Sequence, residues 1–146
     1  MIAACGGEAE PAAEDTAVVD TMPGPTAPRV VPNGSPMPPA ERTAGVPPYP
    51  GAIVWMRVDR RVTEFEAIEA FTPDPYDQVV AYYDSILTDG WTREEFADAV
   101  TYTRDADMGA VMLMPWDASV VPAGAPEPLR TAQTGIGVAW KKELVQ

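Results

Sequence analysis

Two glutamates near the middle of the chain have the spacing of a catalytic carboxylate pair. Glu64 and Glu66 are separated by one residue, so on a strand their side chains would leave the same face roughly 7 Å apart. Inverting glycosidases use a separation in this range, with one carboxyl group as general acid and the other as general base. The alternative is a pair of solvated charges on an edge strand, where charge opposes aggregation. Because no other residues mark a substrate cleft, we expect the structural role.

Other residues could bind metal ions. Asp105 and Asp107 precede Gly109 with the spacing of part of a calcium loop, but the same residue types are typical of a hairpin turn. Thioethers suit Cu(I), and four methionines could contribute to such a site: Met56, Met108, Met112 and Met114. Methionine more often fills gaps in a core. The sequence therefore predicts no metal site.

The residue types that the chain lacks exclude several chemistries. It contains no His and only one Cys. A Cys/His zinc site, a Ser-His-Asp triad and a Cys-His nucleophile are therefore excluded, and no internal disulfide can form. We expect no catalytic residue and no cofactor, and a protein that is not an enzyme.

A Pro-, Ala- and Gly-rich stretch at residues 115–131 is the candidate contact surface. An aromatic side chain on such a loop can anchor a protein or glycan partner, and Trp116 stands at its start. The alternative is that Trp116 caps the core, because Trp is commonly buried. The possible interaction surface consists of Trp116, Asp117, Val120, Val121 and Leu129.

One amphipathic helix is expected from Pro75 to about Asp89. Asp74 is suited to the N-cap, Pro75 to the first helical position and Gly90 to the left-handed residue after the helix. Apolar side chains recur on one face with helical spacing, namely Tyr76, Val79, Val80, Tyr83, Ile86 and Leu87. That face must be buried against other elements.

Six strands are expected around this helix, in the order ββαββββ. Their predicted ranges are 52–58, 62–71, 91–97, 99–104, 109–116 and 134–142. In the second strand apolar and acidic residues do not alternate strictly. A bulge near Ala67 would place the apolar residues on one face. The connections are too short for parallel crossovers, and one helix cannot cover both faces of a parallel sheet. We therefore expect an α+β fold, an antiparallel sheet with one helix on one face.

The beginning of the chain differs in composition from the rest. Residues 1–44 are rich in Pro and contain no aromatic residue, so they cannot bury enough apolar surface to offset their ordering entropy. We expect a disordered Pro-rich tether at residues 6–44 and a single domain at residues 45–146. The net charge of −12 argues against nucleic-acid binding.

The first residues resemble the lipobox of bacterial lipoproteins. Ile2, Ala3 and Ala4 precede Cys5, and the small residue Gly6 follows. The resemblance implies that Cys5 is lipidated and becomes the mature N-terminus after removal of a signal peptide. The protein would then be anchored to the membrane of a bacterial cell envelope, with its domain on the periplasmic or extracellular face. Gly6, in place of an Asp that would retain the protein at the inner membrane, favours the outer membrane if the cell has one.

The folded part resembles a small uncharacterised α+β domain of bacterial lipoproteins and secreted proteins. The shared motifs are the YPGA sequence at residues 49–52, Phe71-Thr72 before Asp74-Pro75, the YY-x3-L pattern at residues 82–87 and Gly90-Trp91. The resemblance implies the ββα-plus-sheet architecture. It supplies no catalytic residues.

Three functional hypotheses follow. The first is an envelope-tethered lipoprotein with a non-enzymatic binding or protein-interaction domain. The second is an envelope hydrolase that uses Glu64 and Glu66. The third is a structural accessory subunit that docks on a larger envelope complex through residues 115–131.

Overall fold

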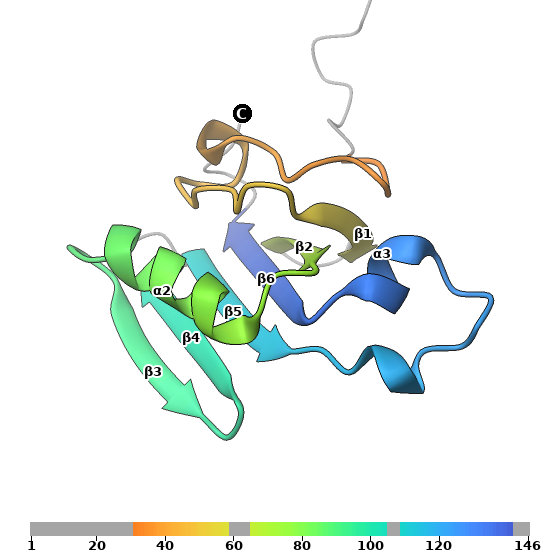
Figure 1. The fold of residues 1–146 in the computed structure, drawn as a ribbon. Coiled ribbons are helices and arrows are strands. Elements are labelled where there is room, and N and C mark those ends of the chain that lie inside the picture. The colour runs from red at the N-terminus through yellow and green to blue at the C-terminus, as the bar shows by residue number, and fades with distance from the viewer. Residues whose placement is uncertain (1–30, 59–64, 105–108, 142–146) are drawn as a thin grey trace, which may run out of the picture. The chain divides into compact units, whose positions relative to one another are not determined.

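A computed structural model of the chain describes residues 31–58, 65–104 and 109–141. Its centre is a six-stranded antiparallel sheet with the order β1-β2-β6-β5-β4-β3 (Figure 1). The strands are β1 (Ile53–Val58), β2 (Phe65–Thr72), β3 (Thr92–Phe96), β4 (Ala99–Arg104), β5 (Gly109–Pro115) and β6 (Thr134–Lys141). The predicted α+β class, the order ββαββββ of the six strands and α2 along the chain, and the antiparallel pairing are confirmed. Cys5 and the first part of the predicted tether lie outside the described residues.

The long helix α2 (Tyr76–Ile86) packs on one face of this sheet, and the main core lies between them. Val79 and Tyr83 of α2 are fully buried there. The sheet contributes alternate residues to the same core, including Val54, Ile68, Tyr102, Val111, Leu113, Ile136, Val138 and Trp140. This period-two alternation is what the sequence pattern predicts for strands with one face on a core.

The ends of α2 differ from the prediction. The N-cap residue is Pro75 rather than Asp74, and no side chain caps the first turn. Asp74 instead accepts hydrogen bonds from other side chains. At the other end the helix stops at Ile86, which is 39 % exposed. Gly90 has a positive φ of 83° as expected, but it belongs to the turn before β3 and not to the helix end.

Residues 31–44 were assigned to the tether, and the structure corrects that boundary. Val31 and the residues after it belong to the same unit as the sheet. Met37 and Thr43 are buried, and the segment includes a 3-10 turn, η1 (Ala40–Arg42). It also bonds to the outer edge of β1, because Gly34 N–H donates to the Val54 carbonyl at 2.7 Å and Val54 N–H donates to Ser35 at 2.8 Å. A Pro-rich composition disfavours regular structure, but tertiary contacts of this kind can still order it.

The opposite face of the sheet is covered at one end by residues 115–133. The sequence predicts a loop at residues 115–131, and the structure has two short helices there, η2 (Ala118–Val120) and α3 (Glu127–Thr131). Beneath them Phe71 is 3 % exposed. Both faces of the sheet are partly covered at β2. This is why apolar residues of β2 point to both faces. The bulge expected near Ala67 is absent from the described β2–β6 register, and the register shift lies in β1, between Val54 and Met56.

Candidate functional site

A groove lies between α2 and the hairpin of β3 and β4. It encloses about 490 Å³ and is open to solvent. Apolar side chains of Val80, Ala81 and Val100 line it together with charged groups. The charged residues are Asp77 and Asp84 on α2, Arg93 and Glu95 on β3, and Asp98 in the turn. Four carboxylates therefore surround one guanidinium group, and the groove is acidic.

Arg93 holds two of these carboxylates in place. Its Nε lies 2.7 Å from Asp84 Oδ1, and its Nη1 lies 2.9 Å from Glu95 Oε1. The hydrogen bond to Glu95, and then that to Asp84, raise the pKa of Arg93 above its usual value. The hydroxyl of Tyr102 donates to the same Asp84 oxygen at 2.7 Å. Burial, followed by this bond to a carboxylate, raises the pKa of Tyr102.

The turn at one end of the groove contains a strained residue. Phe96 pairs with Ala99, so only Ala97 and Asp98 connect β3 to β4. Ala97 has a φ of +56°, a conformation that a residue with a Cβ rarely adopts and that two-residue hairpin turns usually assign to Gly, Asn or Asp. Ala97 and Asp98 both line the groove.

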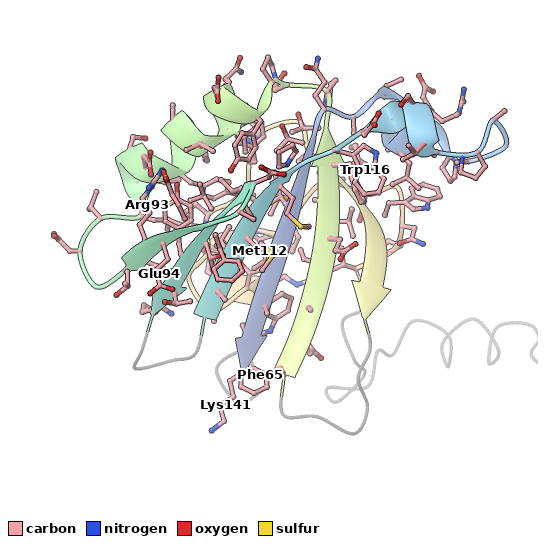
Figure 2. All side chains as sticks on the ribbon, turned by 90° about the horizontal axis from the view of Figure 1, so that it is seen from below. Phe65, Arg93, Glu94, Met112, Trp116 and Lys141 are labelled. Atoms are coloured by element: carbon pink, nitrogen blue, oxygen red, sulfur yellow. The ribbon has the colours of Figure 1, made fainter. Side chains whose placement is uncertain are left out.

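Strand β3, beside the groove, is the last strand in the sheet. All five of its residues are exposed, and Phe96 is 78 % exposed. The other end of the sheet is different, because residues 34–37 bond to β1. Within the described residues, β3 is thus the sheet edge without a neighbouring strand. Neighbouring residues of a strand leave it on opposite sides, and Arg93 and Glu94 can be located on β3 in Figure 2.

Three of the motifs behind the domain resemblance, represented by Tyr49, Asp74 and the Tyr82-Tyr83 pair, meet at one place, and their contacts hold elements of the fold together. Tyr49 donates its hydroxyl hydrogen to Asp74 Oδ2 at 2.7 Å, and Gln78 donates to the same oxygen at 3.1 Å. Tyr82 and Tyr83 donate to carbonyls of the Pro47-Pro48 segment at 2.9 and 3.2 Å. The rings of Tyr49 and Tyr82 are 5.0 Å apart in an edge-to-face arrangement. These residues attach α2 to the segment before β1.

The residues of the predicted contact surface around Trp116 differ in how far solvent reaches them. Trp116 is half-buried, and its indole N–H donates to the Leu129 carbonyl at 2.8 Å. Its ring packs against Phe71 with 4.7 Å between centroids, and Figure 2 shows it beside α3. Asp117 accepts hydrogen bonds from Ser119 and so caps η2, and these bonds lower the pKa of Asp117.

The apolar members of that surface differ in exposure. Val120 is 77 % exposed, whereas Val121 and Leu129 are half-buried. Trp116 therefore closes the loop onto the sheet, and Val120 is the member that solvent reaches most freely.

The carboxylate pair and the metal sites are only partly described. Glu64, Asp105, Asp107 and Met108 lie outside the described residues, as does the side chain of Met56. Glu66 lies on β2, which pairs with β1 and β6 and is an interior strand, so the expected edge position is wrong. Met112 is 42 % exposed on the face opposite α2, at the middle of the sheet in Figure 2. Within the described ranges no three His, Cys, Asp or Glu side chains gather as metal ligands.

The groove between α2 and β3 was not anticipated. Its acidic residues on α2 recur with helical spacing, and Arg93 and Glu95 have the spacing of one strand face, but only the fold sets these faces against each other. No protein-family model, no curated protein and no solved structure matches this chain. Across the described ranges, no helix has both the length and the apolar character needed to cross a membrane.

Proposed function

We propose that this chain is a bacterial envelope lipoprotein whose folded domain is a non-enzymatic protein-interaction module. A lipid on Cys5 would attach it to the membrane, and the outer membrane is favoured where one exists. The observation that carries the binding function is the position of the groove beside the outer edge of β3, which pairs with no strand other than β4 in the described part of the chain. A free sheet edge offers main-chain hydrogen bonds, and a neighbouring groove offers side-chain selectivity.

The arrangement of the groove supports binding better than catalysis. Arg93 bonds both Asp84 and Glu95. These two carboxylates therefore point toward the same guanidinium group and not toward the open groove. Candidate acid–base residues need to lie within hydrogen-bond reach of a reacting group. The hydrolase hypothesis would depend on Glu64 and on Glu66, which lies on an interior strand. We therefore propose no enzymatic activity.

A second candidate function has one observation in its favour. Val120 projects from η2 with 77 % of its surface exposed. An exposed aliphatic side chain on a loop that Trp116 attaches to the sheet through its ring contact with Phe71 could dock on a larger assembly. This would make the protein a structural accessory subunit of an envelope complex.

The lipid anchor is tested by the mass of the N-terminal peptide of the protein purified from its own cells. We expect the mature chain to begin at Cys5 with acyl groups attached. A chain with an unmodified Cys5 would contradict the envelope proposal.

The binding function is tested by photo-crosslinking in intact cells. A photoreactive residue would be placed singly at Asp98 on the groove, at Val120 on η2, and at Glu41 on η1 as an exposed control. A specific protein adduct from position 98 supports the interaction module. An adduct from position 120 alone supports the accessory-subunit alternative. Equal adducts from all three positions, or none from any, contradict a defined interaction surface.

A further inference from the structure

We propose that β3 binds an extended basic segment of a partner protein, which adds as a further antiparallel strand and places Lys or Arg side chains over the acidic groove. The inference rests on the proposed function, because it names the kind of partner that the interaction module would take. Three features carry it: the free edge, the sign of the charge around the groove, and the exposed Phe96.

The main chain of β3 is the first feature. Residues 34–37 already bond to β1 at one end of the sheet, whereas β3 at the other end has no strand on its outer side among the described residues. Every second residue of an edge strand points its N–H and C=O groups away from the sheet. An added strand forms hydrogen bonds with these groups. A five-residue strand that is exposed throughout can accept an extended peptide without a change in the fold.

The charge beside β3 is the second feature. Glu95 and Arg93 lie on the α2 side of the strand, and Asp77, Asp84 and Asp98 lie around them. An added strand would direct every second side chain toward this side. Because four carboxylates outnumber the single guanidinium, the groove favours cationic side chains at those positions. The net charge of −12 would also attract a basic segment over longer distances.

The opposite side of β3 is the third feature. Phe96 leaves the strand on the side away from α2, together with Glu94 and Thr92, and is 78 % exposed. Side chains of the added strand on this side would lie across from these residues. Aromatic and β-branched residues form favourable cross-strand pairs. We therefore expect the partner segment to alternate basic residues with β-branched residues.

A second copy of this chain fits the edge less well. Antiparallel pairing of two β3 strands about their centres would place Arg93 opposite Glu95, which is favourable. It would also place Glu94 directly opposite Glu94 of the second copy, and like charges in that position are destabilising. Both chains carry a net charge of −12, so their approach is repulsive as well.

The first experiment uses defined peptides and the full chain. The probe is a seven-residue peptide that alternates Lys with Val or Thr and has blocked ends. The matched controls are the same peptide with Glu in place of Lys, and the Lys peptide N-methylated at alternate residues on one edge or on the other. Binding is followed by titration calorimetry at low and moderate salt, and by NMR shifts of the amides of β3.

We expect the Lys peptide to bind, to shift the amides of Thr92–Phe96 and to bind more weakly as salt increases. Methylation of one edge should weaken binding at least tenfold, and methylation of the other edge should change it little. The substitution Asp98→Lys should weaken binding severalfold, whereas Glu41→Lys, the same charge change on η1, should change it less than twofold.

Several results would overturn the inference. Equal binding of both methylated peptides would mean charge attraction without strand addition. Absence of binding by the Lys peptide, or equal binding by the Glu peptide, would remove the proposed partner class. A salt-stabilised dimer that competes with the peptide in sedimentation would identify a second copy as the occupant. Crosslinks from position 98 together with no peptide binding would leave the interaction module standing and reject only the basic strand.

Discussion

Ala97 holds the β3–β4 turn in a conformation that its side chain disfavours. Its φ is +56°, and glycine adopts such an angle without the steric penalty of a Cβ. We expect Ala97→Gly to raise the free energy of unfolding by about 1 kcal/mol. Urea denaturation followed by circular dichroism measures this change.

The matched control is the same substitution in an element where glycine is unfavourable. Ala81 is exposed in the middle of α2, and Ala81→Gly should lower the free energy of unfolding by about 1 kcal/mol. If both substitutions destabilise the protein equally, the turn at Ala97 is not strained.

The buried tyrosines make stability depend on alkaline pH. Burial is the main cause that raises the pKa of Tyr83, and it also raises the pKa of Tyr49, Tyr76 and Tyr102 above the ordinary value of 10. In the unfolded chain these groups lose their protons near pH 10, whereas in the folded protein they retain them. Above pH ~10 the folded state therefore binds more protons, and stability falls as pH rises.

Each such tyrosine should reduce the free energy of unfolding by up to about 1.4 kcal/mol per pH unit in that range. Urea unfolding between pH 8 and 11.5 should show a plateau followed by this decline. Tyr83→Phe should make the decline less steep, although it also removes the bond to the Pro47 carbonyl. An equally steep decline in the variant would show that Tyr83 ionises with its ordinary pKa when folded.

At the scale of elements, residues 31–44 behave as part of the domain. They bury Met37 and Thr43 and bond to the edge of β1. A chain that begins at Gly45 should be less stable than one that begins at Val31 by roughly 3–5 kcal/mol, the sum expected for one buried Met and a few hydrogen bonds. Thermal and urea unfolding of the two chains measure the difference. Equal stability would restore the boundary predicted from composition.

The elements that follow local patterns were predictable from the sequence. The six strands and α2 were found within a few residues because alternation and helical spacing are local. Asp74 shows the limit of such reasoning. Its position suited an N-cap, but Tyr49 and Gln78 occupy the same oxygen. Phe71 shows another limit, because its burial depends on Trp116, which is distant in the sequence.

The candidate groove could not have been predicted for the same reason. Asp84 is on α2 and Arg93 is on β3, and their ion pair requires the helix to lie beside that particular strand. The strand order β4-β3 at the sheet edge is a property of the complete topology. Residue types alone directed attention instead to Glu64, Glu66 and Trp116.

At the scale of the whole molecule, the net charge of −12 should oppose the compact state through self-repulsion. We expect the urea midpoint to rise when NaCl is increased from ~20 mM to ~500 mM, because the screening length falls from about 20 Å to about 4 Å. The exposed pairs of Arg93 would respond in the opposite direction, but such pairs contribute at most about 1 kcal/mol.

Arg93→Gln is the control that separates these two effects. It removes the ion pairs with Asp84 and Glu95 and makes the net charge more negative, so its stability should rise more steeply with salt than that of the unaltered chain. A midpoint that falls with salt in the unaltered chain would mean that attractive pairs outweigh the repulsion.

The contact between residues 34–37 and β1 also has a mechanical consequence. In a chain held at its N-terminal side, a pulling force reaches the hydrogen bonds of Gly34 and Ser35 with Val54 before it reaches the rest of the sheet. The segment is antiparallel to β1 at the Pro36–Ile53 bridge. Release of residues 31–44 would add up to roughly 45–50 Å of extended chain while the six strands and α2 remain paired and packed. The segment would thus act as an extensible link that absorbs tension before the domain unfolds.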